Sequence, residues 1–200
     1  MVLPSLHPLP RSFYLRPTLT VAKDLLGKLL VRKIGRNILV GKIVEVEAYL
    51  GRRDPASHAY RGKTKRNEVM FWEGGHLYVY FTYGMHFCAN VVTGREGIGE
   101  AVLLRAVEPL AGIETMKRNR GFGSNQSVYD LTNGPAKLCE AFGIQRARNG
   151  SDLLSDSIMI AQNRTEERPV IVATTRIGIR FGTERRWRFL VKNNPWVSRR

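Results

Sequence analysis

Apolar and polar positions alternate along much of the chain with the two-residue period of β-strands. Several such runs lie between turn signals, and Gly35-Arg36-Asn37 between two of them indicates a hairpin. Residues 75–92 gather aromatic and β-branched side chains around Tyr83-Gly84, a pattern typical of two strands joined by a tight turn. Strands are therefore predicted over residues 29–34, 38–50, 101–107, 170–180 and 188–191, with a further strand pair within 75–92.

Three other stretches place apolar residues at helical spacing: residues 18–26, 108–120 and 135–142. Thr18 is expected to cap the first helix. The third has Pro135 near its start and Gly143 just past its end, an asymmetry that helices favour. The two patterns together predict an α+β fold, a single mixed domain with a curved, mainly antiparallel β-sheet, flanking helices and a protruding β-hairpin.

Two stretches lack either period. Residues 1–17 are rich in proline and are expected to form an extended N-terminal arm, so that residues 18–200 form the single domain. Residues 51–69 carry many cations and predict a long basic loop, and loops of this length are often functional. The cations expected to contact phosphates are Arg61, Lys63, Lys65 and Arg66 of this loop, together with Lys137.

The charge balance indicates a polyanionic partner. The chain has 32 Lys and Arg against 17 Asp and Glu, a formal net charge of +15, and nucleic acid is the commonest polyanion that such a surface binds. Anionic lipid is the weaker alternative, because no basic amphipathic helix stands out. No signal peptide or membrane-length apolar run is recognised, and the two cysteines have no CxxC spacing. We therefore expect an intracellular protein that is not secreted and not membrane-bound.

The strand over residues 38–50 carries two carboxylates on one face. Because side chains alternate along a strand, Glu45, Glu47 and Tyr49 share a side, opposite to Val44 and Val46. Such a face is either a charged surface turned to solvent or the wall of a site, and the segment alone leaves both open.

Aromatic residues in the 75–92 hairpin indicate a surface for bases. Tyr78 and Tyr80 share a face, and Tyr83 precedes the presumed turn, where a ring could enter a base stack and hold it open. Asn90 lies on the following strand, where its amide could contact the edge of a base. The alternative is that these aromatic side chains simply fill the core.

Arg105 interrupts an apolar strand, and a buried guanidinium requires a partner. Glu47 is the natural candidate, and the pair is either a structural ion pair or a device that holds a water molecule. No zinc-binding spacing, nucleotide-binding glycine motif or nucleophile elbow is present. The sequence therefore predicts neither a metal nor a cofactor.

At this point the motifs resemble those of the alkyladenine (3-methyladenine) DNA glycosylase family. The resemblance covers nearly the whole chain from about residue 12, with several distinct motifs in order. The matching stretches are residues 16–30, 45–51, 54–58, 66–67, 70–71, 77–90, 102–109, 114–117, 134–139 and 195–198.

The resemblance implies a monofunctional DNA repair enzyme that flips an alkylated or deaminated purine out of double-stranded DNA and hydrolyses its N-glycosidic bond. It implies a monomer with no metal or cofactor in its chemistry. Carried over by position, it makes Glu47 the general base and Arg105 the residue that helps to hold its water, with residues 177–179 completing the water site. The base pocket would comprise Tyr49, His58, Tyr80 and Asn90, the last excluding guanine, and Tyr83 would fill the gap left in the duplex.

Two departures from better-known members concern the lesion range: the loop after His58 is one residue shorter than in vertebrate-type members, and Met85-His86 stands where another aromatic often follows the glycine. Two rival functions remain. One is a non-catalytic nucleic-acid binding protein on the same fold, in which Glu47 and Arg105 form a structural pair. The other is a metal-dependent nuclease that uses Glu45, Glu47 and Asp54.

Overall fold

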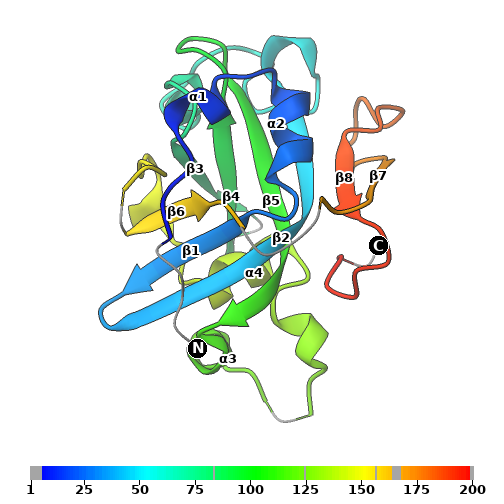
Figure 1. Cartoon of the computed structure of the whole chain (residues 1–200). Coiled ribbons are helices and arrows are strands. Elements are labelled where there is room, and N and C mark those ends of the chain that lie inside the picture. The colour runs from blue at the N-terminus through cyan, green and yellow to red at the C-terminus, as the bar shows by residue number, and fades with distance from the viewer. Residues whose placement is uncertain (1–5, 83, 124, 156, 164–167, 199–200) are drawn as a thin grey trace.

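The computed structural model describes residues 6–82, 84–123, 125–155, 157–163 and 168–198. Its strands form one curled antiparallel sheet, shown in Figure 1, and helices lie against this sheet, so the predicted α+β class is confirmed. The helices are α1 (Arg11–Tyr14), α2 (Thr18–Leu25), α3 (Ile113–Asn119) and α4 (Pro135–Ala141). The strands are β1 (Leu29–Ile34), β2 (Asn37–Leu50), β3 (Leu77–Thr82), β4 (His86–Thr93), β5 (Glu100–Ala111), β6 (Ile158–Ala161), β7 (Ile171–Thr174) and β8 (Arg188–Val191).

β2 is the longest of the described strands and pairs with three others. β5 runs along one edge of β2, and the other edge is shared, because β1 pairs with residues 37–42 and β8 with residues 45–47. The strand order is β3-β4-β5-β2-β1-β6, and the β7–β8 pair joins the same sheet through β8, which lies beside β2 in Figure 1. The handover from β1 to β8 coincides with β-bulges near Ile43, which bend a strand and increase its twist.

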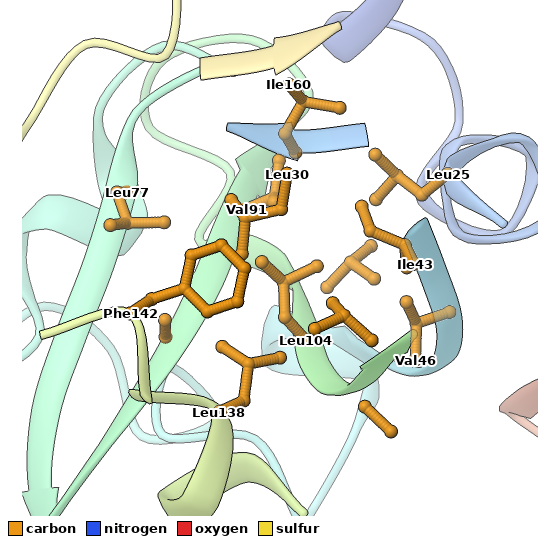
Figure 2. Close-up of a cluster of buried hydrophobic side chains, with 14 of the residues drawn as sticks. Leu25, Leu30, Ile43, Val46, Leu77, Val91, Leu104, Leu138, Phe142 and Ile160 are labelled. Carbon is orange, nitrogen blue, oxygen red and sulfur yellow. The ribbon is translucent and has the colours of Figure 1, made fainter. Parts of the chain in front are cut away.

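The main core fills the space between the sheet and helices α2 and α4. Figure 2 shows how Leu25 of α2, Leu138 of α4 and Phe142 meet the apolar face of the central strands, which includes Val46 and Leu104. These side chains are fully buried, and truncating one such residue to alanine typically costs about 2–5 kcal/mol. The sheet is therefore held rigidly where β2 and β5 lie side by side.

Several predicted elements are confirmed. The 75–92 hairpin forms as β3 and β4, and β2 differs from its predicted range by one residue. Helix α4 begins with Pro135, and Gly143 follows its C-cap with a φ of +59°, as the sequence predicted.

Other predictions were wrong. No helix begins at Glu108, because β5 continues pairing with β2 as far as Ala111. The break comes at Gly112, whose φ of +75° suits glycine and whose added Cβ would lie 2.5 Å from Leu39. Thr18 is the first residue of α2 but does not cap it, because its hydroxyl bonds to Thr93 and Glu100 instead. β6 was missed, since its four residues are too short a run to recognise.

The proline-rich stretch also differs from the extended arm that was expected. Residues 11–14 form helix α1, Tyr14 is fully buried, and Leu9 donates a backbone hydrogen bond to Ile160 of β6. The described part of this stretch therefore packs on the sheet. The boundary at residue 17 stays a prediction.

Candidate active site

Arg105 lies at an irregularity between the two central strands. The register pairs Glu45 with Ala106 and Val46 with Leu104, so Arg105 has no direct partner on β2. Such a bulge redirects a side chain, and here the guanidinium reaches both carboxylates on the neighbouring strand. Arg105 Nε donates to Glu45 Oε1 at 2.9 Å, and Arg105 Nη1 lies 3.3 Å from Glu47 Oε1. The predicted contact with Glu47 exists, but the hydrogen bond goes to Glu45.

Glu45 is enclosed by donors. Besides Arg105, Arg188 Nε donates to Oε1 at 2.6 Å, and the hydroxyl and backbone N–H of Ser198 donate to Oε1 and Oε2 at 2.8 and 2.6 Å. The side chain has no exposed surface. Glu45 therefore joins β2 to β8 and to the C-terminal stretch, and its oxygens are already occupied by the protein.

Glu47 has a different environment. Its Oε1 accepts the backbone N–H of Ile177 at 2.8 Å, and its Oε2 accepts the Tyr49 hydroxyl at 2.9 Å. The side chain is fully buried, so a face turned to solvent is excluded. Burial and the nearby Glu47 carboxylate raise the pKa of Tyr49 well above its usual value, and its hydroxyl therefore stays a donor. Burial by itself lowers the pKa of Arg105, but the Glu47 and Glu45 carboxylates outweigh this effect and raise the pKa above its usual value. The guanidinium therefore stays charged.

A cavity of about 430 Å³ opens beside this cluster, a size typical of small-molecule sites. Glu47 itself does not line it, but three lining residues, Tyr49, Arg105 and Ile177, contact the Glu47 carboxylate. The carboxylate thus lies directly behind the cavity wall. All of the base-pocket residues predicted from the sequence line this cavity: Tyr49, His58, Tyr80 and Asn90.

The aromatic wall is built by β3 and by the segment that precedes it. The Tyr80 ring lies 4.5 Å from that of His58 and 5.6 Å from that of Tyr78, the latter in a stacked arrangement. His58 Nδ1 lies 3.1 Å from the Tyr78 hydroxyl. Tyr78, which the sequence did not place in the pocket, therefore lines the cavity and fixes the orientation of His58.

These side chains are neutral near pH 7. His58 keeps some contact with solvent. Desolvation by the surrounding protein and, to a smaller extent, the Arg66 cation nevertheless lower its pKa below the usual 6.5. Burial raises the pKa of Tyr78 to about 12. The wall thus consists of uncharged rings, which suit the face of an electron-poor purine.

Asn90 is held at the inner part of the pocket by β4. It is 5% exposed, and its Nδ2 donates to the backbone carbonyl of Tyr78 at 3.2 Å. The amide therefore cannot swing aside without losing a hydrogen bond.

The cations predicted to contact phosphates fall into two groups. Arg61, Lys63, Lys65 and Arg66 are exposed along one segment, and Arg66 also lines the cavity. Lys137 instead lies 2.9 Å from Asp130 in an ion pair. Tyr83, predicted to enter the duplex, lies outside the described residues.

Sequence reasoning anticipated the stretch after β7 only in part. The resemblance assigned residues 177–179 to the water site, but the pattern predicted a strand over residues 170–180 and gave no role to Arg176. β7 ends at Thr174, and Arg176 then turns inward to a buried ion pair with Asp54. The stretch 177–181 lines the cavity. A lone arginine and a lone aspartate, 122 positions apart, offer no spacing signal from which this contact could be found.

The arrangement does not favour a metal-dependent nuclease. Glu45, Glu47 and Asp54 each contact an arginine, which occupies the place a cation would need. Within the described ranges, no group of three or more His, Cys, Asp and Glu side chains could hold a metal ion. In the same ranges, the helices are too short or too polar to span a bilayer.

Comparison with known proteins identifies the family of the chain. The family model for methylpurine-DNA glycosylase matches residues 12–195. A protein of Carboxydothermus hydrogenoformans is 53% identical over 193 residues, covering 96% of this chain and 99% of the relative. One of Methanoculleus marisnigri is 51% identical with the same coverage, and one of Francisella tularensis is 50% identical over 92% and 94% of the two chains. All three are provisionally named 3-methyladenine DNA glycosylases.

Proposed function

The chain belongs to the methylpurine-DNA glycosylase family and is a 3-methyladenine DNA glycosylase, and from this premise we propose that Glu47 is its general base. The observation that carries this proposal is the place of Glu47, buried directly behind an aromatic cavity and in contact with three of its lining residues. The enzyme hydrolyses N-glycosyl bonds in damaged DNA. Each role assigned below to a residue belongs to the proposal.

The target nucleotide is extruded from double-stranded DNA into the cavity. Extrusion costs a few kcal/mol, and less when damage weakens base pairing. Stacking on Tyr49, Tyr80 and His58 offsets this cost, since a base on an aromatic ring contributes about 1–3 kcal/mol. A methylated purine that carries positive charge also gains from the negative faces of these neutral rings. Tyr83 occupies the gap in the duplex, a role that rests on the family resemblance alone.

Hydrolysis then requires a water molecule and a negative charge close to the sugar. The bond breaks through an oxocarbenium-like state, which a carboxylate stabilises while it takes a proton from the water. Arg105 and the Ile177 N–H hold Glu47 Oε1 in one orientation. With the carboxylate oriented in this way, Glu47 takes the proton of the water molecule on the side that adjoins the cavity. A cationic base leaves without prior protonation, so no general acid is assigned for it.

The remaining roles concern DNA. The exposed cations of residues 61–66 contact phosphates, and one of them, Arg66, also lines the cavity. We propose that the enzyme acts as a monomer, as the family resemblance implies. Lys137 would have to leave its ion pair with Asp130 to contact a phosphate. Among the described residues no lysine lines the cavity, in accord with simple hydrolysis that leaves an abasic site and an intact strand.

Mass spectrometry of bases released from methylated DNA, with and without chelator, tests this function. We expect free 3-methyladenine in both conditions and unbroken strands. Strand breaks that disappear in chelator would identify a metal-dependent nuclease instead. Tight binding without release of any methylated, deaminated or etheno-adducted purine would identify a non-catalytic binding protein.

A further inference from the structure

A second buried ion pair lies next to the proposed catalytic cluster. Neither Asp54 nor Arg176 has any exposed side-chain surface. Arg176 Nη2 donates to Asp54 Oδ1 at 2.8 Å, while Nη1 donates to Asp54 Oδ2 and to the backbone carbonyl of Ala48 at 3.0 Å. The guanidinium also lies over the ring of Tyr49, with its carbon 4.7 Å from the centroid. Arg176 is thus bound to both β2 and the segment that follows it.

Each partner of the pair begins one wall of the cavity. Asp54 accepts the backbone N–H groups of Leu50 and Ala56, and the stretch 55–58 then contributes Pro55, Ala56 and His58 to the lining. Arg176 directly precedes residues 177–181, all of which line the same cavity. The pair is therefore the point at which these two irregular segments are tied together.

The same pair adjoins the contact made by the general base. The Ile177 N–H, which donates to Glu47 Oε1 at 2.8 Å, belongs to the peptide bond between Arg176 and Ile177. Residues 176–181 lie outside the described strands and helices, so no ladder of backbone hydrogen bonds fixes this N–H. The side chain of Arg176 supplies the anchor instead.

Stability alone does not account for this arrangement. A buried ion pair is weak evidence for stabilisation, since well-packed apolar residues often serve as well. Among the described residues, Arg176 Nε is buried without a hydrogen-bond partner, which is itself unfavourable. What the bidentate geometry does supply is a fixed orientation for both segments.

We propose that Asp54 and Arg176 are positioning residues for base excision: their ion pair sets the spacing of the two cavity walls and holds the Ile177 N–H against Glu47. The inference rests on the proposed function of Glu47. Because neither side chain lines the cavity, both act through their neighbours. A displacement of catalytic groups by about 1 Å can lower a rate by about 100-fold, so the loss of this anchor is expected to reduce excision strongly.

The test compares Asp54→Asn and Arg176→Lys with the wild type under single-turnover conditions on methylated DNA, following 3-methyladenine release. We expect the maximal excision rate to fall by about 10- to 100-fold. Affinity for a duplex that contains a non-hydrolysable abasic analogue is expected to stay at the wild-type value. A fall in affinity with an unchanged maximal rate would overturn the proposal.

Two further variants separate positioning from folding. Arg32→Lys alters another buried arginine, which donates to the Gly143 carbonyl and does not line the cavity, and we expect it to lower the melting temperature without lowering the maximal rate. If either single variant fails to fold, the double variant Asp54→Asn with Arg176→Met removes both charges, leaves no unpaired buried ion and is assayed in its place. A wild-type rate in that folded double variant would overturn the inference.

Glu47→Gln, assayed in parallel, distinguishes the two levels of the argument. If Glu47→Gln excises normally, the proposed base is wrong and the positioning role falls with it. If Glu47→Gln is inactive while the pair variants excise normally, the function stands and only the positioning role is wrong.

Discussion

The backbone N–H of Ile177 donates a 2.8 Å hydrogen bond to Glu47 Oε1, and the two residues are 130 positions apart in the chain. Arg105 Nη1 approaches the same oxygen at 3.3 Å from a third segment. The carboxylate is thus oriented by groups that come together only in the folded protein. If Glu47 is the general base, as proposed, a carboxylate held in this way needs no rearrangement as charge develops on the sugar.

Glu47→Gln is expected to lose at least about 100-fold in single-turnover excision, because a neutral amide neither accepts a proton from water nor stabilises the cationic sugar. The amide has the same shape, and its oxygen still accepts the Ile177 N–H, so the fold and lesion binding should persist. Base release at enzyme excess and affinity for an abasic-analogue duplex measure the two effects. Excision at the wild-type rate would remove Glu47 from the mechanism.

Glu45→Gln should have the opposite effect. The Glu45 carboxylate accepts charge-assisted hydrogen bonds from Arg105 and Arg188 and two bonds from Ser198. Breaking such a buried network leaves unpaired guanidinium groups and costs about 3–5 kcal/mol. Urea unfolding should show this loss, while the protein that remains folded at low temperature still excises the base. A variant of normal stability that cannot excise would assign Glu45 to the chemistry instead.

The different outcomes for the two glutamates mark what strand periodicity can predict. Alternation correctly placed Glu45, Glu47 and Tyr49 on one side of β2, because the bulge next to Glu45 puts its extra residue, Arg105, on β5, and residues 46–50 of β2 then pair with β5 in regular register. Periodicity could not distinguish the surroundings of the Glu45 carboxylate from those of the Glu47 carboxylate. That distinction depends on Arg188 and Ser198, which reach Glu45 from the far end of the chain.

Long-range contacts also explain where the predicted elements failed. Residues 170–180 have the composition of a strand, yet Arg176 enters the interior to meet Asp54, and β7 stops at Thr174. The predicted start of a helix at Glu108 failed because pairing with β2 outweighs local preference as far as Gly112. The grouping of Tyr49, His58, Tyr80 and Asn90 around one cavity was predictable largely because the resemblance supplied these residues.

Stability should depend on pH through His58. Desolvation and the Arg66 cation lower the pKa of His58 in the folded state below 6.5. Between that lowered pKa and about 6.5, the unfolded chain therefore binds more protons than the folded protein does. Folding stability contributed by His58 is therefore present above pH 6.5 and is lost as the pH falls through this interval. Urea unfolding at a series of pH values should show the loss.

His58→Gln is the matched variant for this dependence. Gln does not titrate, so the fall in stability just below pH 6.5 should be smaller in this variant, whatever its absolute stability. Identical pH dependence in the wild type and His58→Gln would show that His58 does not titrate as inferred.

Asn90 is expected to exclude undamaged guanine from the pocket. Its Nδ2 donates to the Tyr78 carbonyl at 3.2 Å, and its side chain is 5% exposed at the inner part of the pocket. By family resemblance this amide crowds the exocyclic amine of guanine, and its fixed orientation prevents it from moving away. Steric discrimination of this kind is worth about 1–3 kcal/mol, so Asn90→Ser should raise release of normal guanine by about tenfold or more. Mass spectrometry of bases freed from unmethylated DNA measures this change, with 3-methyladenine release from methylated DNA as the internal control. If the ratio of guanine to 3-methyladenine release matches the wild type, the discrimination against guanine does not come from Asn90.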